Sequence, residues 1–156
     1  MTEEYDKTKI ITGWEDCVKN HNLLRGIYAY GFEKPSKIQQ VAIVPMSKHT
    51  DILAQSQSGT GKTGCFTVGT LAIIDTSKDT VQALLLSPTR ELAIQTKSVL
   101  DSIASFVKNF RSQLLVGGTS SDDSINNIVS RRPQVVVGCP GRVYDMLRRK
   151  KLNSSE

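Results

Sequence analysis

Four short runs of mainly apolar residues divide the chain. They lie at residues 51–55, 83–87, 113–116 and 134–138. Each run has the length of a strand and is too short for a helix of ordinary length. Because apolar residues follow one another without regular polar alternation, we expect strands that are covered on both faces of a sheet.

Between and before these runs, apolar residues recur every three or four positions, which predicts helices with one buried face. The first helix should end at Gly31, and Pro35 suits the first residue of the second. The inward positions expected in these two helices are Leu23, Leu24, Ile27, Tyr30, Ile38, Val41 and Ala42. Further helices are predicted at residues 62–74, 92–106, 120–129 (with Ser120 as N-cap) and 142–149.

Alternation of strands with helices predicts an α/β fold in which helices cover both faces of a parallel sheet. Ligands of such sheets bind beyond the carboxyl ends of the strands. Residues 1–12 are polar and are expected to form a flexible N-terminal segment, so that residues 13–156 make up one domain or lobe.

The net charge of +5 is unevenly distributed. Residues 1–130 are balanced, whereas residues 131–156 carry seven Lys/Arg and two Asp/Glu. These cations could complement the dipole of a last helix, or form a basic surface for a polyanion. Three cysteines without metal-type spacing favour reduced thiols in the cytoplasm, with the nucleus as a second possibility. The longest purely apolar run, ALLL, indicates no association with a membrane.

The sequence SGTGKT lies between the first predicted strand and a predicted helix. Gly59 and Gly61 allow backbone conformations and close approaches that a Cβ would block. The N–H groups of this turn could face phosphate oxygens, with the positive end of the helix behind them. Lys62 supplies a cation for the outer phosphates and Thr63 a hydroxyl for Mg²⁺. We therefore predict a phosphate site, although kinases, GTPases, motor ATPases and helicases all use one.

An upstream stretch, GFEKPSKIQQ, could select the base. The ring of Phe32 could stack on a base, and the carboxamide of Gln39 complements the donor and acceptor of adenine. Taken alone, these residues fit simpler roles better: Phe32 as a core aromatic ring and Gln39 as a solvated helix residue.

Five motifs occur in a distinctive order: GFEKPSKIQ, SGTGKT, PTRELA, GG and CPGR. In this order they resemble the motifs of the first RecA-like lobe of DEAD-box RNA helicases, from about residue 14 to residue 152. RGIYAYGFEKPS and AQSQSGTGKTG are most similar to the translation initiation factor 4A subfamily. The resemblance implies a partial RecA-like lobe of an enzyme that unwinds or remodels RNA with ATP, in translation initiation or mRNA processing.

The resemblance also implies the cofactors ATP and Mg²⁺. Phe32 and Gln39 would hold adenine, Trp14 stands where the family has an upstream phenylalanine, and Ser56 replaces the usual alanine. Lys62 would be the catalytic cation and Thr63 the magnesium ligand. The nucleotide-binding residues implied in this way are Trp14, Phe32, Lys34, Gln39, Ser56, Gln57, Ser58, Gly59, Thr60, Gly61, Lys62 and Thr63.

RNA is the polyanion that the resemblance implies for the strand-to-helix turns. Thr89 is a natural N-cap, and Arg90 in the first turn opposes the helix dipole unless an anion is near. Cys139 stands where the family has a threonine, which replaces a hydroxyl with a weak donor. Backbone contacts of this kind give little base preference. The RNA-binding residues expected are Pro88, Thr89, Arg90, Gly117, Gly118, Pro140, Gly141 and Arg142.

The family's acidic DEAD sequence does not occur in the chain. Because those acids and an arginine from a second lobe support hydrolysis, the chain alone is expected to be inactive as an ATPase. Its expected partners are RNA and a second helicase lobe or a protein scaffold. Two alternatives remain open: a non-catalytic regulatory module that binds nucleotide or RNA, and an unrelated phosphate-loop enzyme such as a small kinase.

Overall fold

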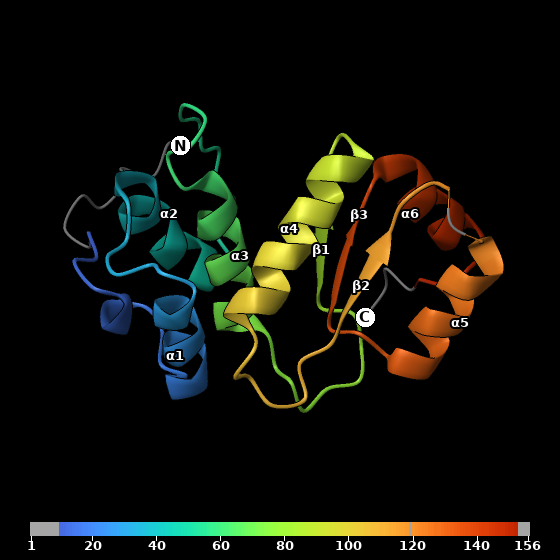
Figure 1. Cartoon of the computed structure of the whole chain (residues 1–156), viewed down its shortest axis with the longest axis horizontal. Coiled ribbons are helices and arrows are strands. Elements are labelled where there is room, and N and C mark those ends of the chain that lie inside the picture. Colours follow the sequence, from blue (N-terminus) through green and yellow to red (C-terminus); the bar gives the residue numbers. More distant parts are fainter. Residues whose placement is uncertain (1–9, 119, 153–156) are drawn as a thin grey trace.

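The structure, a computed structural model, describes residues 10–118 and 120–152 (Figure 1). Its elements in chain order are the 3-10 turn η1 (Trp14–Asp16), α1 (His21–Ala29), α2 (Lys37–Ser47), α3 (Lys62–Ile73), β1 (Ala83–Leu86), α4 (Arg90–Ile103), β2 (Ser112–Leu115), α5 (Ser121–Arg131), β3 (Val135–Gly138) and α6 (Pro140–Arg148). Residues 1–9 of the predicted flexible segment lie outside the described residues. Ile11 differs from that prediction, because it is buried and its N–H donates to the Gln40 carbonyl.

The strands form a parallel sheet in the order β1-β3-β2. The central strand β3 is buried along its whole length, as its run of three valines predicts. Val136 lies opposite Leu84 on one side and opposite Gln113 on the other. The predicted α/β class with a parallel sheet is confirmed.

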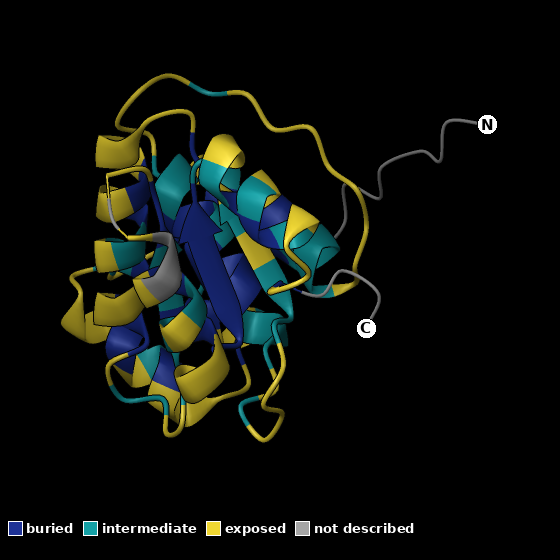
Figure 2. Cartoon of the chain, turned by 90° about the vertical axis from the view of Figure 1, so that its right-hand side faces the viewer, coloured by how far each residue is buried: buried dark blue, intermediate teal, exposed yellow. Residues whose placement is uncertain are grey.

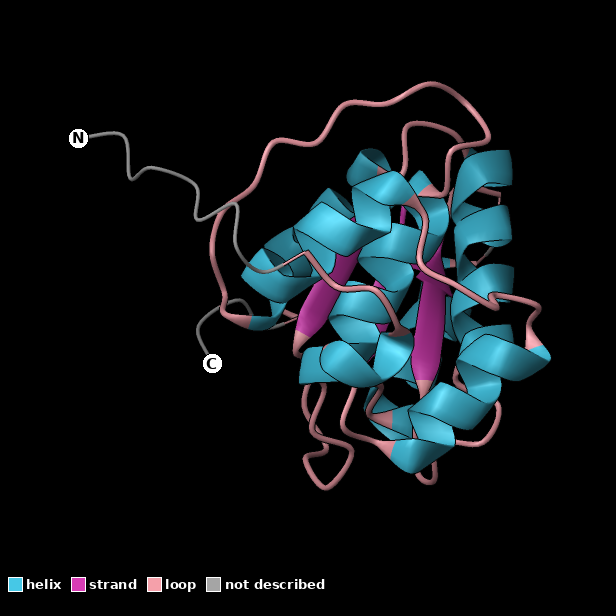
Figure 3. Ribbon diagram, turned by 90° about the vertical axis from the view of Figure 1, so that its left-hand side faces the viewer, coloured by secondary structure: helices cyan, strands magenta, loops and turns pink. Residues whose placement is uncertain are grey.

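Helices cover both faces of this sheet (Figures 1 and 3). Successive residues of β3 point to opposite faces. Val135 and Val137 therefore share a core with Leu100 and Ile103 of α4, and α3 and α1 pack against α4 from outside. On the other face, Val136 joins a core formed with α5 and α6. Figure 2 shows the buried residues gathered on the sheet and the inner sides of the helices.

The helix ends differ in detail from the sequence prediction. Helix α2 begins after Ser36 rather than at Pro35, because the Gln39 side chain accepts the Ser36 N–H at 2.8 Å and fixes the first turn there. Val41, expected to point inward, is 38% exposed. Helix α6 begins at Pro140, two residues before the predicted start, since proline suits a first helical position. The predicted N-cap Ser120 is confirmed, and it accepts the Asp123 N–H at 3.4 Å.

The predicted strand at residues 51–55 is wrong. Residues 51–57 form neither helix nor strand, and no strand within residues 10–118 and 120–152 pairs with them. Isolated strand backbone cannot satisfy its N–H and C=O groups except with water. Leu53 is accordingly fully exposed, and the segment belongs to the loop between α2 and α3.

Candidate functional site

The loop before α3 has the backbone of a phosphate cradle. Gly59 and Gly61 have φ angles of 78° and 96°, a region that residues with a Cβ rarely adopt. Gly61 is the N-cap of α3, and no side chain caps this helix end. The first N–H groups of α3 are therefore left for an anion, and the positive end of the helix dipole adds to the attraction.

Lys62 closes this loop on itself. Its ammonium group donates to the carbonyl oxygens of Ser56 and Gln57, the second at 2.7 Å. The Thr60 hydroxyl oxygen lies 2.7 Å from both Ser56 Oγ and the Gln57 carbonyl. A phosphate oxygen accepts a stronger hydrogen bond than a neutral carbonyl. Lys62 can therefore exchange these carbonyls for a phosphate, so the loop residues fit a nucleotide polyphosphate.

A magnesium ion would find few protein ligands at the loop. Thr63 is half-buried in the first turn of α3, at the position where its hydroxyl can face the loop. Within residues 10–118 and 120–152, no three His, Cys, Asp or Glu side chains lie together as a metal site. Mg²⁺ typically binds through one or two protein groups, with phosphates and waters completing its shell. Thr63 fits that mode of binding.

Gln39 lies beside the loop but faces protein. Its side chain is 2% exposed, and Nε2 donates to the Gly61 carbonyl at 3.0 Å. With Oε1 bonded to the Ser36 N–H, the carboxamide connects α2 to the phosphate loop. The hydroxyl of Ser36 is buried next to Gly61, in the first turn of α2 that the Gln39 side chain closes, a neighbour of the phosphate loop that was not predicted.

Trp14 does not reach the loop. Its indole is fully buried, and Nε1 donates to the Phe32 carbonyl at 2.8 Å. The rings of Trp14 and Phe32 are stacked at a centroid distance of 6.2 Å, and Tyr30 meets Phe32 edge-on at 4.9 Å. No face of the Trp14 ring is open in this structure, and its contact with a base stays a prediction. Trp14 supports Phe32, which is half-buried against Gly64 of α3. Lys34 is exposed.

A groove of about 560 Å³ runs from the phosphate loop to the open edge of β1. Lys62 and Thr63 line one end, and Leu86 and Pro88 line the other. Ile52, from the loop that was predicted as a strand, contributes to its wall. The groove joins the phosphate loop to the first of the three strand-to-helix turns.

The structure brings the three predicted turns together at the carboxyl edge of the sheet. The Ser87 N–H donates to the Gly138 carbonyl and the Cys139 N–H to the Leu115 carbonyl, each at 2.9 Å. Thr89 caps α4 by accepting the Leu92 N–H at 3.3 Å, as predicted. The predicted residues of these turns are Pro88, Thr89 and Arg90 after β1, Gly117 and Gly118 after β2, and Pro140, Gly141 and Arg142 after β3.

Arg90 has a protein partner in this arrangement. Its Nη1 donates to the Gly117 carbonyl at 2.7 Å, which ties the turn after β1 to the turn after β2. A Cβ on Gly118, whose φ is 81°, would lie 2.3 Å from that same nitrogen. The glycine therefore makes room for the arginine. One function of Arg90 is to position the turns.

Within the described residues, no helix is both long and apolar enough to cross a membrane.

Comparison with known proteins identifies one family. The family model described as DEAD/DEAH box helicase matches residues 36–156. The chain is 47% identical over 156 residues to ATP-dependent RNA helicase eIF4A of Chaetomium globosum, covering all of this chain and 38% of the relative. It is 46% identical over 152 residues to ATP-dependent RNA helicase FAL1 of Mycosarcoma maydis, covering 97% of this chain and 38% of the relative.

Solved structures agree with this result. A DEAD box protein from the hyperthermophile Methanococcus jannaschii matches with a TM-score of 0.83 and 31% identity, over 92% of this chain and 39% of that chain. Dbp5 of S. cerevisiae bound to RNA and ADP BeF3 matches with a TM-score of 0.79 and 38% identity, over 92% of this chain and 36% of that chain. The chain thus spans less than two fifths of the length of these relatives.

Proposed function

Because the chain belongs to the DEAD/DEAH box helicase family, we propose that it forms the ATP- and RNA-binding part of an ATP-dependent RNA helicase. One observation supports this function most directly. The phosphate loop and three strand-to-helix turns share one edge region of the molecule, joined by the groove beside β1. A site of this form can bind a nucleotide and a polyanion backbone next to each other.

The residues divide between two tasks. At the nucleotide end, the first-turn N–H groups of α3 and the Lys62 ammonium would bind the phosphates, and Thr63 would hold Mg²⁺. Phe32 is the candidate base contact, since its ring lies against Gly64 in the first turn of α3. When bound, ATP supplies the phosphoryl group whose transfer to water drives unwinding in such helicases. The positive charge of Lys62 would stabilise the charge that develops on the outer phosphates.

At the RNA end, the turns after the strands present backbone N–H groups at helix starts together with Arg142. Helix starts and arginine bind phosphate oxygens irrespective of the base. The solved relative named as bound to RNA and ADP BeF3 supports this assignment. Other solved structures are of S. cerevisiae Dbp5 bound to Gle1, in one case together with Nup159. We therefore extend the proposal to a protein partner or a second lobe that completes the enzyme.

Nucleotide binding by the purified chain tests the proposal. A fluorescent ATP analogue should bind, and Lys62→Ala should weaken it about tenfold or more, because a hydrogen bond to a charged group contributes about 1.5–3 kcal/mol. Lys48→Ala is the matched control, since Lys48 is an exposed lysine at the end of α2, away from the loop. Equal affinities of the native chain and Lys62→Ala would rule out the phosphate loop as the binding site.

A further inference from the structure

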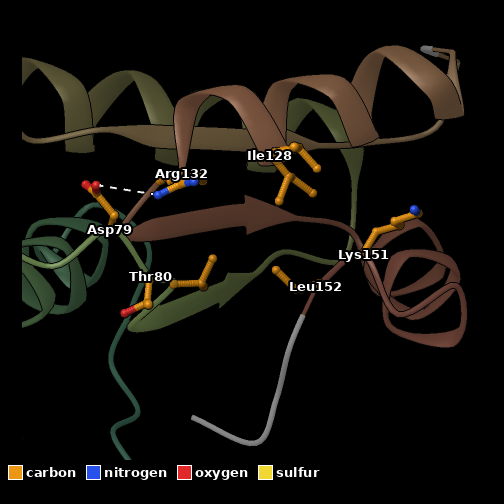
Figure 4. Close-up of a pocket in the computed structure, with 9 residues that line it drawn as sticks. Asp79, Thr80, Ile128, Arg132, Lys151 and Leu152 are labelled. Atoms are coloured by element: carbon orange, nitrogen blue, oxygen red, sulfur yellow. Dashed lines mark ion pairs between the residues drawn. The ribbon is translucent and has the colours of Figure 1, made fainter.

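A second cavity lies at the other end of the strands from the proposed site (Figure 4). Its volume is about 370 Å³, and it opens between the segment that leads into β1, the end of α5 and the segment after α6. Val81 and Pro133, which line it, come just before β1 and β3. The cavity is therefore at the amino ends of the strands, and the proposed helicase function makes no use of it.

About half of the wall of this cavity is apolar, and Val81, Ile128, Val129, Pro133 and Leu152 provide that half. Ile128 and Leu152 are 7% and 5% exposed and belong to the core beneath α5 and α6. Val129 is 62% exposed at the rim. An exposed valine beside a hollow lined with buried aliphatic groups gives a partner's apolar side chain a place to be removed from water.

The charges around the cavity are mainly positive. Asp79 is the single acidic residue that lines it, and both of its oxygens face arginines. Arg111 contacts Oδ1, while Arg132 lies 4.0 Å from Oδ2 with a side chain that is 66% exposed. Lys151 is exposed on the other side of the cavity (Figure 4). Three cations around one carboxylate leave an excess of positive charge, so carboxylates of a partner would be attracted.

We propose that this cavity is a docking site for an acidic peptide segment of a partner protein. One large apolar side chain of the peptide enters the hollow beside Ile128 and Val129. Neighbouring carboxylates of the peptide face Arg132 and Lys151. RNA fits the site less well, because a phosphate backbone would use the cations and leave the apolar walls uncovered.

The backbone at Arg132 allows a clean test. Arg132 and Lys150 both have left-handed φ angles, 46° and 53°, and both are exposed cations. Asparagine tolerates this conformation, so Arg132→Asn and Lys150→Asn remove the same charge without new backbone strain. Of these two described residues, Arg132 lines the cavity and Lys150 does not. Lys150→Asn is therefore the matched control.

The probe is a fluorescein-labelled peptide in which one leucine is flanked by aspartates, titrated into the full chain at low salt. Arg132→Asn should weaken binding by about two- to fivefold, since an exposed ion pair contributes up to about 1 kcal/mol, and Lys150→Asn should weaken it less than about twofold. Val129→Ser should weaken binding of the leucine peptide but not of a peptide with serine in place of leucine. Such a double-mutant comparison isolates the contact between the two side chains.

Three outcomes would overturn the proposal. The first is no saturable binding of the leucine peptide. The second is an equal effect of Arg132→Asn and Lys150→Asn, which would indicate diffuse charge attraction only. The third is equal binding of the leucine and serine peptides together with displacement of both by single-stranded RNA, which would make the surface a nucleic-acid site. Binding of the ATP analogue is measured in parallel and is expected to be unchanged in all variants.

Discussion

At the scale of single residues, Gln39 shows how one side chain can connect two motifs. Its carboxamide suits adenine, yet here it joins the start of α2 to the carbonyl of Gly61. A Cβ on Gly61 would lie 2.8 Å from Gln39 Nε2, so the amide and the loop backbone are in close contact. Gln39 therefore shapes the phosphate loop, and its direct contact with adenine stays a prediction.

The first prediction concerns the stability that this link supplies. Gln39→Ala leaves the Ser36 N–H unpaired and removes one of the two hydrogen bonds that the Gly61 carbonyl accepts, the other coming from the Cys65 N–H. An unpaired buried group costs about 1–3 kcal/mol. The free energy of unfolding, measured with urea, should fall by that amount. Gln40→Ala is the control on the same helix, because the side chain of Gln40 donates a single hydrogen bond, to the Pro35 carbonyl at 3.1 Å. A loss as large in Gln40→Ala would show that Gln39 has no special role.

Thiol reactivity gives a second prediction at this scale. Burial raises the pKa of the thiols of Cys17 and Cys65 to about 11. At pH 8 only about one molecule in 10³ then carries either thiolate, and the thiolate is the reactive form. In the native chain, iodoacetamide should therefore modify Cys139 first, as mass spectrometry can show, whereas all three should react alike in urea. Labelling of Cys65 as fast as Cys139 in the native chain would contradict the burial.

The same pKa values determine how these two thiols contribute to the pH dependence of the free energy of unfolding. A thiol whose pKa is raised by folding keeps its proton in the native state when the unfolded chain already loses it, above about pH 8.5. The contribution of these two thiols is present in full below that pH and decreases as the pH rises toward 11.

At the scale of elements, helix packing depends on where the glycines lie. Gly26 of α1 is buried against the end of α4, and a Cβ there would meet the Ile103 carbonyl oxygen at 1.8 Å. Gly69 of α3 is also buried, but the nearest atoms to its Cβ would all belong to the Met46 side chain: Cε at 2.5 Å, Sδ at 2.7 Å and Cβ at 3.4 Å. The first obstacle is backbone, and the second is the end of a flexible side chain.

The third prediction uses this pair of glycines. Gly26→Ala should lower the free energy of unfolding by about 3 kcal/mol, since α1 must move away from α4. Gly69→Ala should change it by less than about 1 kcal/mol, because the better helix propensity of alanine offsets the shift of Met46. Thermal melting followed by circular dichroism measures both. Similar losses in the two variants would mean that α1 is not held against α4 at Gly26.

At the scale of the whole molecule, the RNA edge exists only because the sheet collects three distant turns. Hydrogen bonds between the strands and the following turns, and the bond from Arg90 to Gly117, hold these turns in place. Helix α6 starts at the carboxyl ends of the strands and runs back toward their amino ends. Arg142 lies in its first turn, and Arg148 lies in its last turn beside Asp145.

The fourth prediction compares these two arginines in RNA binding. Arg142→Ala should weaken binding of single-stranded RNA of any sequence and reduce the slope of log affinity against log salt by about one unit or less. Arg148→Ala removes the same charge from the same helix and should leave that slope unchanged. Fluorescence anisotropy over a series of salt concentrations measures both. A larger effect of Arg148→Ala would move RNA to the other end of the molecule.

The sequence by itself determined the elements whose signals are local. Apolar runs predict buried parallel strands because such strands need apolar side chains on both faces, and three of these runs form β1, β2 and β3. Only β3 is buried throughout, since Leu84 and Leu86 of the edge strand β1 are 40% and 55% exposed. Caps such as Thr89 and Ser120 act within three residues, so their helix starts were predictable too. The ordered motifs indicated the family in the same way, since each motif is a short run of consecutive residues.

Tertiary structure alone decided what depends on neighbours distant in sequence. Residues 51–55 have the composition of a strand, but without a paired neighbour their backbone remains with water. The aromatic ring of Trp14 suits both a base contact and the core, and only the tertiary structure shows that packing covers this ring. Gln39 and Arg90 likewise have the chemistry for a ligand, and each bonds to a carbonyl more than twenty positions away. Sequence specifies which groups a residue offers, whereas the fold determines which partners reach them first.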